Sequence, residues 1–211
     1  APVVATTDIA AALQLTTGKV TATVAGTATD LLAVLDNAKP TDALTLEVSA
    51  ATAAQLKALD AKTSVAVDAS AVTVITGTAA DLKTVLAANT ITKAANVAVT
   101  VDGKVSAADL NTIANATTGA VTADVTGSAA ALNAALKVVN TDDTVTATLT
   151  GTTAAAKDLI ELADKDTLVT TSIKTITGTL AEITAVTVTV TTIVAADVAV
   201  TITGTLTSAD K

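Results

Sequence analysis

The chain has 211 residues and a net charge of −8; half of its residues are apolar, yet it contains no Phe, Tyr, Trp, Met, Cys, His or Arg. Without basic patches or stacking aromatics it is a poor partner for nucleic acid, and without cysteine it forms no disulfide or thiolate metal site. Thr, Asp and Lys interrupt every apolar run before the ~18 residues that a membrane helix needs, so no membrane insertion is expected.

The first third of the chain alternates short predicted strands and helices. In chain order we expect a weak helix over 8–15, a strand over 20–25, a helix opened by Thr27 and Asp30, a strand over 44–49 and a helix through Leu56 and Leu59. Segment 64–76 predicts two strands separated by a bend at 68–70. Thr78 and Asp81 then open a helix with Leu82, Val85 and Leu86 on one face, and residues 89–96 turn back.

The segment 97–110 combines both parts of this unit. Val97, Val99 and Val101 alternate with smaller or polar residues, which predicts a strand that Gly103 ends. Ser106 lies three residues before Asp109, where a helix N-cap and its first-turn acid belong.

The second half repeats the order of the first. We expect a strand over 121–126, a helix from Ser128, a strand over 145–150, a helix over 159–162 and an extended segment over 168–177. Thr179 and Glu182 form a helix cap, but the alternation over 186–190 favours a strand, so this helix is expected to be short or lost. A last strand is expected over 198–203, followed by residues 205–211, which are too few to form the next helix.

The strand ends recur at regular intervals. They lie at Gly26, Ala50, Gly77, Gly103, Gly127, Gly151, Gly178 and Gly204, so the spacings are 24, 27, 26, 24, 24, 27 and 26 residues. Four spacings sum to 101, and Thr16-Thr17-Gly18 and Asp42 recur 101 positions later as Thr117-Thr118-Gly119 and Asp143. Repeats of this length are typical of solenoids.

We therefore predict an α/β fold: a right-handed parallel βα solenoid of about eight coils of 24–27 residues. Residues 1–211 would form one continuous solenoid built from two four-coil tiles, approximately 4–104 and 105–205.

Two columns of residues follow from this register. The residues two before each strand end are all aliphatic and are expected to face the interior: Val24, Val48, Ile75, Val101, Val125, Leu149, Ile176 and Ile202. The residues three before each end are expected to face outward: Thr23, Glu47, Val74, Thr100, Asp124, Thr148, Thr175 and Thr201.

Acidic residues are the candidate metal ligands. Those at Asp30, Asp81, Asp109 and Glu182 follow a Ser or Thr by three residues, and helix capping explains them better than calcium. Turn acids are a second set: Asp102, Asp124, Asp142, Asp143, Asp164 and Asp166. Calcium needs several converging oxygens, and the glycine-rich nonapeptide of calcium-binding β-rolls is absent. No metal site or cofactor is therefore assigned, and calcium stays an alternative.

The outward column offers a second binding alternative. Five of its eight members are Thr, and threonine ladders on flat parallel solenoids resemble ice-binding faces. Glu47, Val74 and Asp124 interrupt the row, and Thr favours strands in any case.

A catalytic role is not expected. Without His, Cys or Tyr the chain lacks the commonest general bases and the cysteine nucleophile, and no spacing of its carboxylates or lysines selects a catalytic pair. No catalytic or cofactor-binding residue is assigned.

Three phrases carry a resemblance to a known class of proteins: Val74-Ile-Thr-Gly-Thr-Ala-Ala-Asp-Leu82, Ser106-Ala-Ala-Asp-Leu-Asn111 and Thr118-Gly-Ala-Val-Thr-Ala-Asp-Val-Thr-Gly127. They resemble tandem repeats of very large exported bacterial proteins, especially cyanobacterial cell-surface proteins associated with motility or surface layers. The resemblance implies an extracellular spacer, adhesin stalk, surface-layer or filament module, and it carries no functional residue over.

These observations predict a non-catalytic structural repeat module at the cell surface. Neither end of the chain shows a polar capping repeat, so each end is expected to continue head to tail. The partner is then an adjacent repeat of the same chain or another copy.

Overall fold

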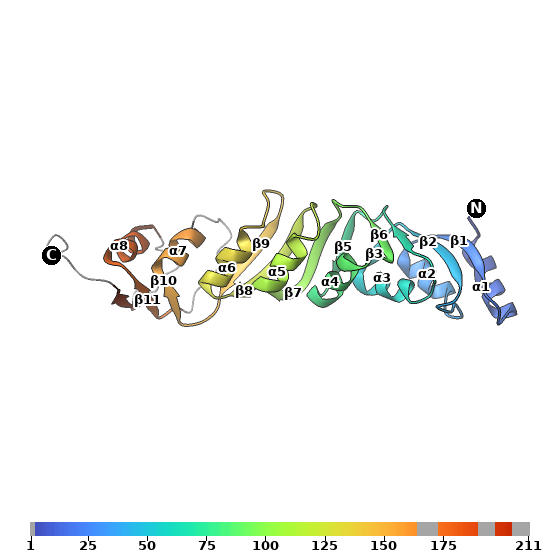
Figure 1. The fold of residues 1–211 in the computed structure, drawn as a ribbon, viewed down its shortest axis with the longest axis horizontal. Coiled ribbons are helices and arrows are strands. Elements are labelled where there is room, and N and C mark those ends of the chain that lie inside the picture. Colours follow the sequence, from blue (N-terminus) through green and yellow to red (C-terminus); the bar gives the residue numbers. More distant parts are fainter. Residues whose placement is uncertain (1–2, 164–172, 190–196, 204–211) are drawn as a thin grey trace. The chain divides into compact units, whose positions relative to one another are not determined.

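The protein is an α/β chain in which short strands alternate with helices and pair into parallel sheets (Figure 1). The structure, a computed structural model, describes residues 3–163, 173–189 and 197–203. It divides into two compact units, Ala1–Asp102 with Thr112–Thr122, and Gly103–Asn111 with Ala123–Lys211.

The first unit contains four helices and the strands between them. Its helices are α1 (Thr6–Leu15), α2 (Ala28–Val34), α3 (Ala53–Asp60) and α4 (Ala79–Ala87). Its strands are β1 (Thr21–Gly26), β2 (Ala43–Val48), β3 (Ala51–Thr52), β4 (Val67–Ala69), β5 (Val74–Gly77), β6 (Ile91–Lys93) and the first part of β7 (Ala98–Ser106).

Two parallel sheets run through the first unit, each in chain order. One has the order β1-β2-β4-β6, and the other places β3, β5 and β7 side by side. Thr21 pairs with Ala43 and Val67 with Ile91 in the first sheet, and Thr76 pairs with Thr100 in the second. Neighbouring helices α1 to α4 pack against one another in the same order. Each strand thus pairs with one that lies about one repeat later in the chain.

The second unit repeats this arrangement. Its elements are β8 (Val121–Gly127), α6 (Ala129–Leu136), β9 (Thr144–Leu149), β10 (Thr153–Ala155), α7 (Ala156–Ala163), β11 (Thr175–Gly178), α8 (Leu180–Thr189) and β12 (Ala199–Ile202). Strands β10, β11 and β12 form a parallel sheet, and α6, α7 and α8 pack in succession. Residues of α5 (Ala107–Ala114), β7 and β8 are divided between the two units.

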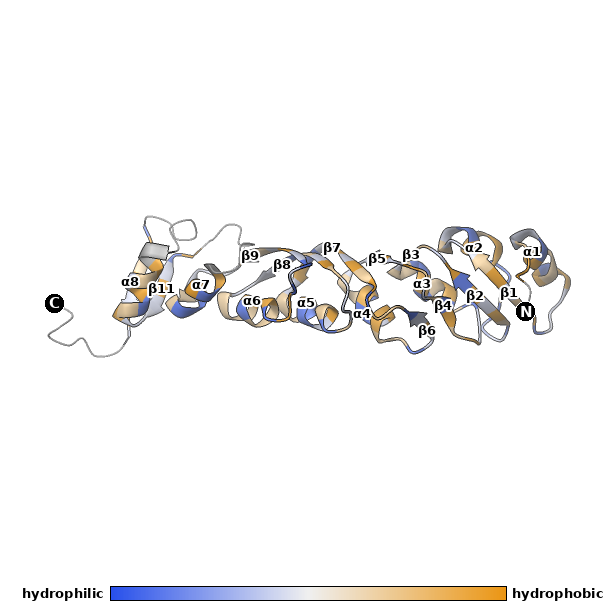
Figure 2. Ribbon diagram, turned by 90° about the horizontal axis from the view of Figure 1, so that it is seen from above, coloured by the Kyte–Doolittle hydropathy of each residue, from blue (hydrophilic) through white to orange (hydrophobic). Residues whose placement is uncertain are grey.

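Small aliphatic residues fill the interior. Each helix faces it with a leucine or isoleucine at its fourth position, and Leu31, Leu56, Leu82, Leu110, Leu132 and Leu159 are fully buried. Both polar and apolar residues colour each helix in Figure 2, as expected for amphipathic helices. The aliphatic residues two before each strand end are also buried, as predicted, except that Ile202 is 41% exposed. They do not form one column, because the strands pair two residues away from the predicted register: Val24 lies beside Leu46, and Ile75 lies beside Val99.

Strand-end glycines make room for the helix of the previous repeat. A Cβ on Gly77 would lie 2.9 Å from the Cβ of Ala53, and one on Gly178 would lie 2.9 Å from that of Ala156. Both alanines are the fully buried first residues of their helices. Glycine is therefore required here by close packing, since the described glycines with positive φ are two others, Gly103 and Gly151.

Three predictions about individual elements were wrong. Gly103 does not end its strand, because β7 runs through it to Ser106. The turn over 89–96 contains β6, and the two short strands β3 and β10 were not predicted. Helix α8 is ten residues long, because Thr179 caps it and Ile183 and Val186 are buried on one face. The extended segment over 168–177 falls partly outside the described residues, as does 205–211.

Candidate functional site

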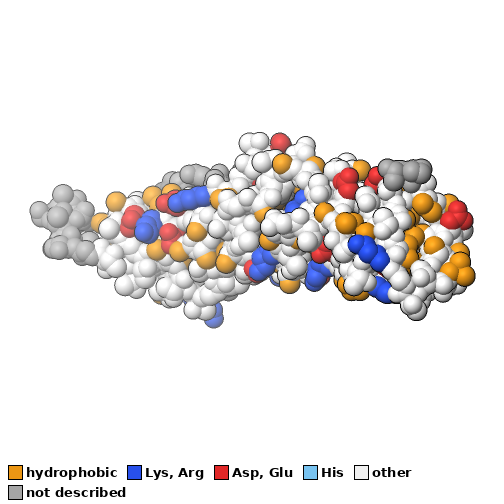
Figure 3. Space-filling view, turned by 45° about the vertical axis from the view of Figure 1, so that its right-hand side comes forward, with side chains coloured by type: hydrophobic (Ala, Val, Ile, Leu, Met, Phe, Trp, Pro, Cys, Tyr) orange, Lys and Arg blue, Asp and Glu red, His pale blue; other side chains and the backbone are white. Residues whose placement is uncertain are grey.

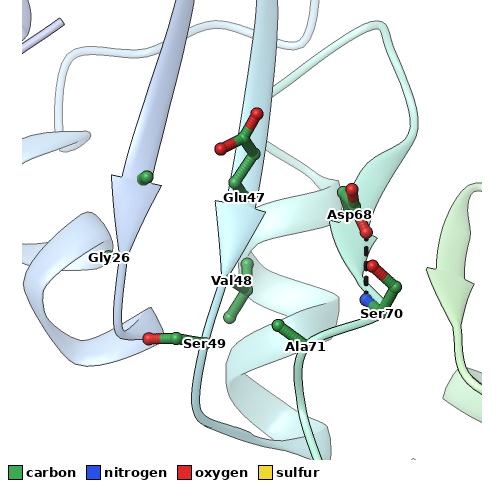
Figure 4. A pocket seen from close by; sticks show the side chains of 8 residues that line it. Gly26, Glu47, Val48, Ser49, Asp68, Ser70 and Ala71 are labelled. Atoms are coloured by element: carbon green, nitrogen blue, oxygen red, sulfur yellow. Dashed lines mark hydrogen bonds between the residues drawn. The ribbon is translucent and has the colours of Figure 1, made fainter. Parts of the chain in front are cut away.

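A pocket lies at the carboxyl ends of β1, β2 and β4 in the first unit (Figure 4). It encloses about 470 Å³ and is widely open to solvent. Its lining consists of Ala25, Gly26, Glu47, Val48, Ser49, Asp68, Ser70 and Ala71. This pocket is therefore open, and Glu47 and Asp68 are the charged residues in its lining.

The two acids of this pocket come from neighbouring strands. Glu47 of β2 is the register partner of Asp68 of β4. The carboxylate of Asp68 accepts a hydrogen bond of 3.0 Å from the backbone N–H of Ser70, and Figure 4 shows this pair beside the Glu47 side chain. Hydrogen bonds from the Ser70 hydroxyl and backbone hold the pKa of Asp68 below its usual value. The carboxylate of Asp68 is accordingly a hydrogen-bond acceptor at neutral pH.

The acids at helix starts act in capping, as predicted. The hydroxyls of Thr27, Thr78, Ser106 and Thr179 each accept the backbone N–H of the acid three residues later, at 3.1–3.3 Å. Each hydroxyl also donates to that acid's carboxylate at 2.7–3.0 Å. A cap of this kind satisfies a backbone donor that the helix leaves unpaired.

Two of these acids have lowered pKa values. For Asp81 the main cause is the hydrogen bond from Lys57 of the neighbouring helix, followed by that from Thr78. For Glu182 the causes are hydrogen bonds from the backbone and hydroxyl of Thr179. Each acid therefore bonds to the start of its own helix, and Asp81 also bonds to the helix of the previous repeat.

The turn acids do not gather. Asp102, Asp124 and Asp142 are exposed, Asp143 is half-buried, and Asp164 and Asp166 lie outside the described residues. Among residues 3–163, 173–189 and 197–203, no three acids come together in a way that would hold a metal ion. Calcium binding through these acids stays a prediction without a site.

The outward column is uneven. Thr100, Thr148 and Thr175 are half-buried and Thr201 is exposed, as are Glu47, Val74 and Asp124. Thr23 was predicted to face solvent, but it is only 9% exposed, because Val3 pairs with it and the Val4 N–H donates to its carbonyl at 2.8 Å. The threonines therefore do not form one continuous ladder.

The most deeply buried acid was not predicted as a site. Asp42 is fully buried, and its carboxylate accepts the backbone N–H groups of Val20 and Lys39, each at 2.8 Å. Burial alone would raise its pKa, but these two hydrogen bonds and the charges of Lys39 and Lys19 outweigh it and leave the pKa lowered. The recurrence of the acid at Asp143, where Asn140 N–H donates at 2.7 Å, is the signal that marks it in the sequence.

Threonines at the turns join one repeat to the next. Thr63 is 8% exposed, and its hydroxyl donates to Leu44 O at 2.8 Å while it accepts Leu44 N–H at 3.0 Å. Thr117 is 7% exposed and donates to Val97 O at 2.5 Å. Each buried hydroxyl thus links a turn to the strand of a neighbouring repeat.

Charged side chains on the surface are dispersed. On the face shown in Figure 3 they stand singly or in small groups of mixed sign, with no continuous basic area. Within the part of the chain that the structure describes, no helix is both long and apolar enough to cross a membrane.

Comparisons with protein-family models, curated proteins and solved structures find no match to this chain. The helix-cap hydroxyls and the buried side chains of Asp42, Thr63 and Thr117 bond to the backbone, and the bonds of the last three join successive repeats.

Proposed function

We propose that the protein is a non-catalytic structural repeat module, a right-handed parallel βα solenoid of about eight coils that acts as a spacer or filament segment. The observation that carries this proposal is the pairing of each strand with the strand about one repeat later, as in Thr76 with Thr100 and Thr175 with Ala199. Such a stack extends in one direction, because every coil contacts only its neighbours.

The distribution of polar contacts supports the same role. Links between neighbouring helices join Gln55 to Thr29, Lys57 to Asp81 and Asn133 to the carbonyl of Asp158. Buried polar groups at Asp42, Thr63 and Thr117 also act between segments about twenty residues apart. These polar side chains therefore hold neighbouring repeats together.

We place this module outside the cell, as part of a surface layer, stalk, adhesin or filament. The support is the resemblance of its repeats to those of large exported bacterial surface proteins. Antibodies raised against the chain should label intact cells of the source organism, and labelling that requires permeabilised cells would contradict the location.

The spacer role predicts that length grows in proportion to the number of tiles. A chain with one additional 101-residue tile, inserted between Lys104 and Val105, should be longer by a fixed amount in small-angle X-ray scattering. Four coils with steps of ~4.8 Å between strands and ~8–10 Å between helices put that amount at roughly 20–40 Å. A second added tile should contribute the same increment.

A globular packing of the tiles would give a different result. The maximum dimension would then rise by progressively smaller steps as tiles are added, and this outcome would contradict the solenoid and the spacer role together.

A further inference from the structure

Strand β12 corresponds to the first part of β7, but it lacks the cover that β7 has. Val200 and Ile202 are 47% and 41% exposed, whereas Val99 and Val101, located 101 positions earlier, are 1% and 7% exposed. All four residues of β12 are exposed. Among the described residues, β12 is therefore a β7-like strand at the edge of its sheet.

The repeat identifies the strand that would fit beside β12. After β7 comes the strand β8, and the residues that correspond to β8 101 positions earlier form β1. Among the described residues, the outer edge of β1 is paired only by an isolated bridge between Val3 and Thr23, the third residue of the strand. The amino half of that edge, next to Lys19 and Thr21, has the register that β12 would occupy.

The contact between β7 and the start of β8 gives the geometry. Val99 N–H donates to Ala120 O at 2.8 Å. The corresponding pair is Val200 N–H with Lys19 O of a second copy. In β12, Ala199 and Thr203 donate their N–H groups to β11, so the N–H of Val200 points to the other edge, where this bond would form.

The turn before β1 is packed less closely than the corresponding turn before β8. Thr117 and Gly119 fit closely against the backbone at 96–97, where a Cβ on Gly119 would lie 2.3 Å from Asn96 O. The corresponding Gly18 meets only its own neighbour Thr16, at 3.3 Å, and Thr16 is exposed where Thr117 is buried. In a docked pair, Gly18 would approach Asp197 and Val198 of the other copy.

We propose that β12 of one copy docks in parallel on the amino half of β1 of a second copy, so that copies associate head to tail in the register of β7 and β8. This inference rests on the proposed stacking of repeats. In the docked pair, Val3 and Val4 of the second copy keep their pairing beside Thr23.

Two substitutions separate the two halves of this contact. Gly18→Ala adds a methyl group where the free chain has room but the docked pair has none. Val200→Pro removes the outward N–H of an edge strand, a position where proline is tolerated. Gly26→Ala is the matched control, because a Cβ there would be 3.7 Å from Leu31 and the position lies outside the docking edge.

Sedimentation velocity of the full chain over a range of concentrations tests the proposal. The unmodified chain and Gly26→Ala should grow in mass with concentration, while Gly18→Ala and Val200→Pro should each weaken association at least about tenfold. Far-ultraviolet circular dichroism should be the same for all four.

The decisive experiment mixes the two impaired variants, Gly18→Ala and Val200→Pro. Gly18→Ala keeps a competent β12 and Val200→Pro keeps a competent β1, so an equimolar mixture should form a dimer and nothing larger. A monomeric unmodified chain at high concentration, undiminished association of both variants, or a mixture without dimer would each overturn the docking. None of these results would alter the tile-length measurement, which tests the spacer role separately.

Discussion

Replacing Gly119 with alanine is expected to destabilise the first unit by about 3 kcal/mol or more. The added Cβ would lie 2.3 Å from Asn96 O and 2.6 Å from both Val97 C and Val97 O, so it collides with backbone that no side-chain rotation can move. The turn would have to lift away from the strand, which would also break the bond from the Thr117 hydroxyl to Val97 O.

Gly18→Ala is the control for this substitution. The two glycines occupy the same place in the repeat, and both donate their N–H to a threonine hydroxyl two residues earlier at 3.0 Å. Since a Cβ on Gly18 would meet only the movable Thr16 hydroxyl within 4 Å, a change below about 1 kcal/mol is expected. The chain has no aromatic residue, so urea unfolding is followed by circular dichroism. Equal losses for the two variants would refute the close packing of repeats at Gly119.

Replacing Asp42 with alanine is expected to cost about 2–5 kcal/mol, because two buried backbone N–H groups, those of Val20 and Lys39, lose their acceptor. Asp42→Asn keeps one acceptor oxygen and should cost less. Asp143→Ala is the matched variant one tile later, and since Asp143 is half-buried its loss should be about 1 kcal/mol. Urea midpoints of the three variants measure these differences.

The Asp42 carboxylate makes the stability of the folded chain depend on pH. The pKa of Asp42 is lower in the folded chain than its usual value near ~3.9, so the folded state binds this proton more weakly than the unfolded state. Its contribution is therefore complete above about pH 4 and is lost as the pH falls through the folded-state pKa. Asp42→Asn should flatten the stability profile below about pH 4, and an unchanged profile would show that other acids carry the dependence.

The periodic part of the fold could be predicted from the sequence. The recurrence of Val or Ile two residues before Gly, followed by Ser or Thr, places β1, α2, β5, α4, β8 and α6 correctly, and an acid three residues after the hydroxyl also marks α2 and α4. These elements combine a repeated spacing with local caps, so each of two independent signals indicates the same boundaries.

Elements that depend on neighbours could not be predicted in this way. Strand β6 has three residues and one buried side chain, Ile91, so it has no alternation to detect, and its pairing with Val67 defines it. In α8 the local alternation favours a strand, but burial of Ile183 and Val186 and the Thr179 cap favour the helix. Tertiary contacts outweigh β-propensity here.

The candidate site was predictable only in part. Helix capping at Asp30, Asp81, Asp109 and Glu182 follows from the spacing of hydroxyl and acid. The burial of Asp42 does not, because a loop acid has the same local sequence whether it faces solvent or accepts two backbone donors. The pocket beside Glu47 and Asp68 depends on strand register between β2 and β4, which the sequence does not specify at single-residue precision.

Cysteine cross-linking tests most directly whether successive repeats stack in parallel and in register. The chain has no cysteine, so Thr76→Cys with Thr100→Cys introduces a single pair, at register partners of β5 and β7. Parallel neighbours lie ~4.8 Å apart, within the range that a disulfide spans, whereas Thr76→Cys with Asp102→Cys lie ~8 Å apart. The account predicts that mild oxidation closes the first pair nearly completely and the second pair far less, with the difference abolished in urea. A first pair that stays reduced, or a second pair that closes equally well, would contradict it.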